Sequence, residues 1–158
     1  AKKFNGTSYI VNIPSLVDTK EIKESIERDS TARGIFKLSK KVNVSIICMG
    51  DISTESSLYR TGQLSLEELD YLSNLGVIGD INYLFVDKDG KFVQNEISER
   101  IINIFPIELM KSTNYVVGIA ITPRKSKILH AALKGNLINV LMTDVDAANE
   151  IMDQHTAE

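Results

Sequence analysis

The chain has 158 residues, of which 43% are hydrophobic and 25% are charged, and its formal net charge is −3. This length and composition are typical of one globular domain that buries roughly 70% of its unfolded surface around a single core. Lys and Arg (18) nearly balance Asp and Glu (21), so the chain has no basic field that would collect nucleic-acid phosphates. We therefore do not expect this chain itself to bind DNA.

Cysteine usage and hydropathy restrict the cellular setting. The single cysteine, Cys48, lies in the apolar run Val44–Met49, which excludes a disulfide framework and predicts a buried thiol in a reducing compartment. No apolar stretch approaches the ~20 residues of a membrane span, and the N-terminus lacks a signal-peptide pattern. We expect a cytoplasmic protein with no membrane partner. We expect residues 1–158 to form a single, partial domain, and because Ala1-Lys-Lys has no initiator Met, we expect it to belong to a longer polypeptide.

The N-terminal third alternates strand and helix patterns. Residues 9–13 are apolar and β-branched and end at Pro14, which predicts a first strand. Asp18-Thr-Lys-Glu21 has the spacing of a helix N-cap, and a second helix is predicted from 30 to 40. A strongly apolar strand follows from 42 to 49. A strand, two helices and a strand predict a crossover between parallel neighbours.

The middle of the chain carries turn signals. Ser65-Leu-Glu-Glu68 is a capping box that begins a helix, and Gly76 ends that helix. Residues 83–93 alternate around Asp89-Gly90, a dipeptide favoured in tight hairpins. We therefore predict a β-hairpin excursion from the main sheet.

Residues 115–144 have the pattern of one β–α–β unit: strand, turn, helix, glycine stop and strand. A last helix is predicted after the capping spacing at 143–146. In parallel α/β sheets, ligands bind beyond the carboxyl ends of the strands. Thr122, Lys125 and Asp144 fall at those ends, which predicts a small-molecule pocket.

Seven segments carry a resemblance by their order and spacing: Val44–Gly50, Leu58–Ser65, Leu75–Ile81, Phe85–Gly90, Arg100–Ile102, Val117–Ala120 and Ala132–Asp144. Together they resemble the sugar-binding effector domain of SorC-type bacterial transcriptional regulators, over nearly the whole chain. The resemblance implies an α/β, Rossmann-like, mostly parallel sheet flanked by helices, related to sugar-phosphate isomerases and deaminases. It also implies a phosphorylated sugar as effector, a homo-oligomer, and DNA binding through an N-terminal helix-turn-helix that this chain lacks.

Five residues are candidates for ligand binding. Lys125 lies in the first turn of a helix after a strand end, where helix N–H groups and an ammonium hold anions. Arg60 can make bidentate contact with a phosphate, and Asp80 can accept hydrogen bonds from sugar hydroxyls. Gly50 and Thr122 complete the set. A glycine at a turn lets the backbone approach a phosphate closely, and Thr122 falls at the end of a predicted strand.

Each candidate also has a purely structural interpretation. Lys125 is one of three cations, with Arg124 and Lys127, that would lie on a solvated helix face. Asp80 fits a turn or cap aspartate, and Arg60 an ordinary surface arginine in a glycine-containing loop. The sequence alone leaves these alternatives open.

Other polar residues point to structure rather than chemistry. His130 and His155 have no partner at the spacing of a metal site or a catalytic triad. Residues 87–90 lack the further acidic positions of a calcium loop and fit a hairpin turn. Arg100 fits an ion pair as well as a ligand contact. We therefore expect no metal, no cofactor and no catalytic residue.

Three functions remain open. The first is a sensor that binds a phosphorylated sugar and shifts a regulator between two states. The second is a sugar-phosphate isomerase or deaminase with Asp80 as general base and Lys125 stabilising an enediolate. The third is an oligomerisation module without ligand, because Ile121-Thr122 replaces two small glycines that relatives commonly have before the lysine-bearing helix.

Overall fold

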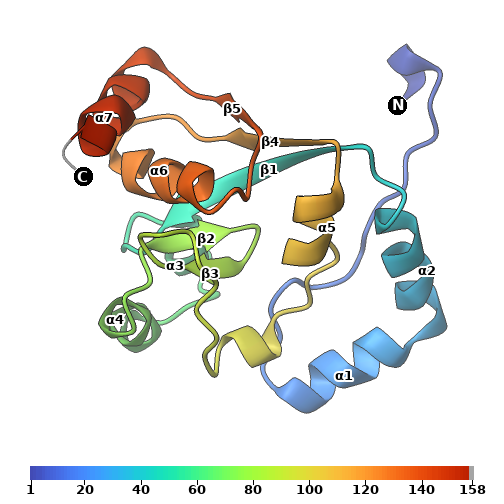
Figure 1. The fold of residues 1–158 in the computed structure, drawn as a ribbon. Helices are drawn as coiled ribbons and strands as arrows, with labels where there is room; N and C mark the ends of the chain where they lie inside the picture. Colours follow the sequence, from blue (N-terminus) through green and yellow to red (C-terminus); the bar gives the residue numbers. More distant parts are fainter. Residues whose placement is uncertain (157–158) are drawn as a thin grey trace.

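The computed structural model describes residues 1–156, and a five-stranded sheet lies at its centre (Figure 1). The strands are β1 (Val44–Asp51), β2 (Gly79–Ile81), β3 (Leu84–Val86), β4 (Tyr115–Ile119) and β5 (Val140–Met142). They lie in the order β3-β2-β1-β4-β5. β1, β4 and β5 run parallel, whereas β2 is antiparallel to both β1 and β3. The predicted α/β class is confirmed.

Helices and short 3-10 turns surround the sheet. The α-helices are α1 (Lys20–Arg28), α2 (Ser30–Ser39), α3 (Ser57–Arg60), α4 (Leu66–Asn74), α5 (Ile107–Ser112), α6 (Ser126–Lys134) and α7 (Val145–Thr156). The 3-10 turns are η1 (Lys2–Phe4), η2 (Ser98–Arg100) and η3 (Pro123–Lys125). Figure 1 shows α6 and α7 together beside the parallel strands, whereas α1 and α2 stand away from the sheet. In the described part of the chain, every helix is too short or too polar to span a bilayer.

The segment from β4 through α6 to β5 forms the β–α–β unit that the sequence predicts. β4 and β5 pair in parallel, with Gly118 opposite Leu141. Pro123 begins η3, α6 follows directly, and Gly135 caps its C-terminal end. The carboxyl ends of β1 and β4 consequently meet at one edge of the sheet.

One face of the sheet carries the main core. Ile47 and Met49 of β1 and Val116 of β4 are almost fully buried and cluster with Ile128 and Leu129 of α6. Full burial of one such side chain stabilises the fold by about 1.5–3 kcal/mol. A second apolar cluster joins α3, α4 and β3, and consists of Leu58, Leu64, Leu69, Leu72, Val77, Phe85, Ile97 and Ile101.

The opposite face of the parallel strands is open. Side chains alternate along a strand, so Val44, Ile46 and Cys48 of β1 point away from the core, and all three are exposed. Tyr115 and Met142 of the neighbouring strands are exposed on the same face. The expectation of a buried Cys48 thiol is therefore wrong, because nothing in residues 1–156 covers this face.

The predicted first strand does not form. Residues 9–13 belong to no strand, and Tyr9 and Ile10 are exposed. The nearest pairing is an isolated bridge between Leu16 and Ile101. β1 already has β2 and β4 as neighbours, so the predicted crossover to a parallel partner at residues 9–13 is wrong.

The helix starts are mostly where the caps predict them. Ser65 and Glu68 form the complete capping box of α4. The cap of α1 is Thr19, one residue beyond the predicted position, and its hydroxyl accepts from the Ile22 N–H. At α7, Asp144 rather than its predecessor accepts the Ala147 N–H at 2.8 Å. The spacing therefore locates each helix to within one residue.

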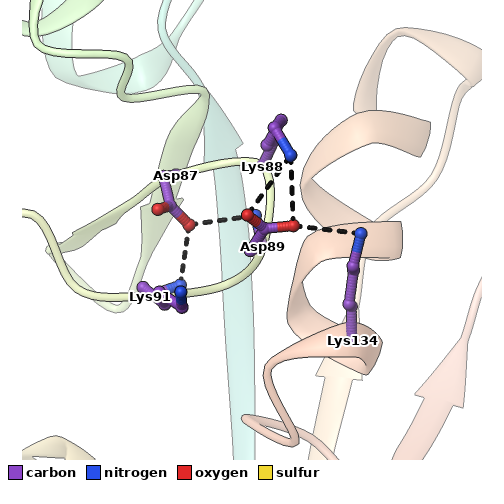
Figure 2. Close-up of polar contacts among 5 residues, drawn as sticks. All are labelled: Asp87, Lys88, Asp89, Lys91 and Lys134. Carbon is purple, nitrogen blue, oxygen red and sulfur yellow. Dashed lines mark hydrogen bonds and ion pairs between the residues drawn. The ribbon is translucent and has the colours of Figure 1, made fainter.

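The predicted hairpin forms only in part. The chain reverses between Asp87 and Lys91 (Figure 2). The Asp87 N–H donates to the Lys91 carbonyl, and a single isolated bridge, between Val86 and Phe92, follows. The true hairpin is β2–β3, and its turn holds Asn82 and Tyr83 at φ 52° and 66°. Dihedrals of this kind are typical of hairpin turns, although they are uncommon for tyrosine.

Candidate functional site

Two adjoining pockets open at the carboxyl end of β1. The larger, which we call the outer pocket, has a volume of about 450 Å³. The smaller, the inner pocket, has a volume of about 190 Å³. Gly50, Ser57 and Lys125 line both pockets, so the two cavities share a wall. This is the sheet edge at which the strand order predicts a ligand.

The outer pocket is rich in cations. Arg60, Arg124 and Lys125 line it, together with the hydroxyl-bearing residues Ser57 and Thr61. Arg60 is the last residue of the short helix α3, whose start is fixed by Ser56 accepting the Tyr59 N–H. Guanidinium and hydroxyl groups are the usual partners of phosphate oxygens. The carboxylates of Asp51 and Glu55 also line this pocket.

Asp80 lines the inner pocket from β2. The residue is 8% exposed, and its Oδ2 accepts the Tyr83 N–H at 3.0 Å. Burial raises the pKa of its carboxyl to about 6, because desolvation disfavours the charged form. The Tyr83 N–H and the positive charge of Lys125 lower this pKa, and the negative charge of Asp51 raises it. Near neutral pH this carboxylate is an acceptor that is poorly solvated.

Gly50 makes room for Asp80. A Cβ at position 50 would lie 2.5 Å from Asp80 Oδ1, so the Asp80 carboxylate would have to move. The two residues pair directly across β1 and β2. β1 also continues through Gly50 to Asp51, beyond the end that the apolar pattern predicts.

Lys125 joins the two pockets. Its Nζ donates to the Met49 carbonyl at 2.8 Å, and this bond fixes the ammonium beside β1. An ammonium has three donors, so it retains capacity for an anion. The simple interpretation of Lys125 as an exposed cation on a solvated helix face is therefore wrong.

Thr122 lies apart from the other four candidates and lines neither pocket. Its backbone N–H donates to Asp144 Oδ2 at 2.5 Å, and the φ angle of Thr122 is 85°. The N–H groups of Ala147 and Thr122, in that order, lower the pKa of the Asp144 carboxyl. The two strand-end residues thus connect β4 to α7, and the structure brings together Arg60, Asp80, Lys125 and Gly50 only.

Sequence reasoning misses three charged residues of the outer pocket, which are Asp51, Glu55 and Arg124. The sequence places Arg124 on a solvated face with Lys127, but Arg124 lies 3.7 Å from Asp51, measured from Nε to Oδ2. Asp51 itself carries no signal beyond its place after Gly50. Its Oδ2 accepts the Ser53 hydroxyl at 2.7 Å, whereas its Oδ1 is buried and has no hydrogen-bond partner.

A third pocket, of about 320 Å³, lies between α1 and the β2–β3 turn. Its two lysines face carboxylates, since Lys20 pairs with Glu99 at 3.2 Å and Lys23 with Glu27 at 3.9 Å. Neutralised cations attract an anion weakly. The outer pocket has one similar pair, Arg124 with Asp51, but its Arg60 and Lys125 form no ion pair with another residue of 1–156, so it is the better anion site.

The remaining polar candidates have structural roles. Arg100 forms an ion pair with Glu68, which ties η2 to α4. The rings of His130 and His155 lie 6.1 Å apart between α6 and α7. Within residues 1–156, no group of three His, Cys, Asp or Glu side chains is arranged to hold a metal ion.

Comparison with known proteins identifies the family of the chain. A family model described as "Putative sugar-binding domain" matches residues 1–153. The deoxyribonucleoside regulator of Bacillus subtilis (strain 168) is 29% identical over 157 residues, which are 99% of this chain and 47% of that protein. A transcriptional regulator from Streptococcus pneumoniae TIGR4 shares the fold with a TM-score of 0.88 at 22% identity, over 98% of this chain and 59% of that one.

The full-length sorbitol operon regulator SorC from Klebsiella pneumoniae has a TM-score of 0.82 at 25% identity, over 91% of this chain and 46% of that one. The chain spans about half the length of the curated relatives it matches. Because the family match extends over nearly every residue, the chain belongs to the family of sugar-binding domains found in SorC-type transcriptional regulators.

Proposed function

We propose that the two pockets together bind a phosphorylated sugar as the effector of a transcriptional regulator. The observation that carries this proposal is the shared wall at Lys125, with Arg60 and Arg124 on one side and the buried Asp80 on the other. A phosphorylated sugar has the same arrangement of groups, an anion at one end and hydroxyl donors along the rest.

Each pocket suits one end of such a ligand. The phosphate occupies the outer pocket, where Arg60 can contact two phosphate oxygens and Lys125 adds a third donor. The sugar extends into the inner pocket, where Asp80 accepts from its hydroxyls. A hydrogen bond to a charged acceptor contributes roughly 1.5–3 kcal/mol. Gly50 contributes by leaving space for the Asp80 carboxylate.

The proposed response is a shift between two states of a longer, oligomeric regulator. A ligand changes such an equilibrium only by its difference in affinity for the two states. DNA would be bound by a separate domain, since this chain has a net charge of −3 and no basic field. The related proteins named above are regulators, which supports this role.

The enzymatic alternative has one supporting observation. The raised pKa of Asp80, about 6, suits a general base that works near neutral pH. Its proposed partner Lys125 already donates to the Met49 carbonyl. Turnover of a sugar phosphate by the 158-residue chain, measured as isomer or ammonia formation, would displace the sensor proposal.

Thermal unfolding with a panel of ligands tests the sensor proposal. The panel pairs glucose 6-phosphate, fructose 6-phosphate, ribose 5-phosphate and 2-deoxyribose 5-phosphate with their unphosphorylated sugars. A true effector at a hundredfold excess over its Kd stabilises the folded state by about 2.7 kcal/mol. We expect stabilisation by at least one phosphorylated member and by none of the free sugars. No stabilisation by any member would leave only the oligomerisation role.

Variants locate the site. Arg60→Ala and Lys125→Ala should each weaken binding more than about tenfold, or about 1.4 kcal/mol. Lys127→Ala is the matched control, because Lys127 lies two residues after Lys125 at the start of α6, is exposed and lines neither pocket. If all three changes weakened binding equally, the cause would be a nonspecific loss of positive charge, and Arg60 and Lys125 would no longer be assigned to the site.

A further inference from the structure

Asp51 stands out among the groups of the outer pocket because half of its carboxylate is unsatisfied. Oδ2 accepts the Ser53 hydroxyl at 2.7 Å, whereas Oδ1 is buried with no donor. The side chain as a whole is 15% exposed. Buried carboxylate oxygens are nearly always hydrogen-bonded, so an orphaned one beside a pocket indicates a donor that arrives with a ligand.

The contact between Asp51 and Arg124 is loose. Arg124 Nε lies 3.7 Å from Asp51 Oδ2, which is within ion-pair distance but too long for a hydrogen bond. The Arg124 side chain is also 45% exposed, so little packing holds it. An anion that enters the pocket can therefore compete with Asp51 for this guanidinium.

The carboxylate can adapt when that exchange occurs. The Cβ–Cγ torsion of aspartate is broad and roughly two-fold, so rotation interchanges the two oxygens at low cost. After Arg124 turns to an anion, Asp51 faces the same anion with an unpaired charge. The Asp51 charge then repels an anion that has no hydrogen-bond donor, whereas Asp51 accepts a hydrogen bond from an anion that carries one.

We propose that Asp51 determines specificity in the outer pocket, by selecting ligands that carry a hydroxyl or ammonium donor next to the phosphate-bearing carbon. This inference rests on the proposed function and narrows its ligand class. A sugar phosphate with a donor on the neighbouring carbon is accepted, because Arg124 takes the phosphate and Asp51 takes the donor. A fully ionised anion without any donor is discriminated against.

The test compares sulfate, which has no donor at pH 8, with the sugar phosphate that stabilises the chain most in the panel above. Calorimetric titration gives both Kd values for the wild type and for Asp51→Asn. Removal of a like charge about 4 Å away in a solvated site should tighten sulfate binding about fivefold. The ratio of the sulfate Kd to the sugar-phosphate Kd should fall at least about tenfold, because the charged acceptor for the sugar is also lost.

A merely structural Asp51, which only positions Arg124, would give a different pattern. Both affinities would then fall together in Asp51→Asn and their ratio would stay constant, which would overturn the proposal. Ser53→Ala is the control for local structure, since it removes the hydroxyl bond to Asp51 but keeps the charge. In Ser53→Ala, the ratio of the sulfate Kd to the sugar-phosphate Kd should remain within about twofold of the wild-type ratio.

A second readout follows Arg124 directly. In the wild type, sulfate should shift the Nε–Hε resonance of Arg124 in a ¹H–¹⁵N spectrum, and in ligand-free Asp51→Asn this resonance should already differ from its wild-type position. If sulfate leaves the Arg124 resonance unchanged, Arg124 does not turn from Asp51 to the bound anion, and the proposal is overturned. Failure of the proposed function looks different: no sugar phosphate binds the wild type, although Asp51→Asn still tightens sulfate.

Discussion

The two faces of the parallel strands differ in what covers them. On one face, Ile47 is 4% exposed and belongs to the main core with α6 and α7, whereas its neighbour Ile46 is 68% exposed on the other. A strand that is apolar on both faces is typical of a sheet covered on both sides. In residues 1–156 only one side has its cover. The covered face therefore carries the stability of this chain.

The inner pocket belongs to the less covered side. Asp80 pairs with Gly50, and a Cβ at Gly50 would meet the Asp80 carboxylate, so both lie on the same side of the sheet as Cys48. Cys48 itself lines the inner pocket. The face opposite the main core thus contributes Gly50 and Asp80 to the site, whereas Asp51 of the outer pocket points, by the same alternation, to the side of α6.

The largest predicted effect comes from truncating the same residue type on the two faces. Ile47→Ala should lower the free energy of unfolding by about 2–5 kcal/mol, because it removes a buried side chain and leaves a cavity. Ile46→Ala should change it by no more than about 0.5 kcal/mol, as for most surface substitutions. Urea unfolding measures both. A cost for Ile46→Ala as large as that for Ile47→Ala would show that the open face is covered in solution.

The next largest predicted effect concerns the buried carboxyl group of Asp80 in the inner pocket. The Asp80 pKa is about 6 in the folded chain, against 3.8 for an aspartate in water, so the folded chain binds this proton more tightly than the unfolded chain does. Its contribution to stability is therefore fully present below pH 3.8 and is lost as the pH rises to 6. At 1.36 kcal/mol per pKa unit, the loss is at most about 3 kcal/mol.

Asp80→Asn isolates this contribution. The variant cannot ionise, so its stability relative to the wild type should rise between about pH 4 and pH 7 by up to about 3 kcal/mol. Urea unfolding at several pH values measures the difference in the free energy of unfolding between the variant and the wild type. The other carboxyl groups titrate in both proteins, so their contributions cancel in this difference. A difference that stays constant with pH would mean that Asp80 is not desolvated.

Local sequence signals predict the β4–α6–β5 unit and the start of α4 well. The β4–α6–β5 unit and the capping box of α4 depend on residues a few positions apart, and both form as predicted. Residues 9–13 have equally good strand propensity, but a strand needs a free neighbour, and both sides of β1 are taken. Propensity contains no information on which edges are available.

The site is predictable only in part for the same reason. Strand ends and the family resemblance identify Lys125 and Asp80. They do not identify Asp51 and Arg124, because the pairing of these two residues joins β1 to η3 across a large sequence separation. Thr122 lies at the predicted strand end, but only its distance from the pockets in space separates it from the others.

A glycine substitution tests how closely β1 and β2 approach beneath the site. Gly50→Ala should destabilise the chain by about 1–3 kcal/mol, because the new Cβ would displace the Asp80 carboxylate. Gly34→Ala in α2 is the matched control, since nothing lies within 4 Å of its Cβ. Alanine is the better helix former, so this change should stabilise α2 by about 0.5–1 kcal/mol. Equal effects of the two changes would contradict the close packing.

The smallest effect concerns the loop that closes the covered side against α6 (Figure 2). Asp87 Oδ1 accepts the N–H groups of Asp89 and Lys91, both at 2.9 Å, and Gly90 lies directly against the end of α6. Asp87→Ala should therefore cost about 1–2 kcal/mol, the usual contribution of two such hydrogen bonds. Urea unfolding at low and high salt measures it.

Asp89→Asn is the control for charge in the same loop. Asp89 pairs with Lys134 at 3.0 Å and with Lys88 at 3.2 Å, and these lysines, in that order, lower the pKa of its carboxyl (Figure 2). Salt screens exposed ion pairs, so the effect of Asp89→Asn should be smaller than that of Asp87→Ala and should vanish at high salt. The effect of Asp87→Ala should persist there, because backbone hydrogen bonds do not depend on ionic strength. If salt removed both effects, charge rather than backbone capping would hold the loop against α6.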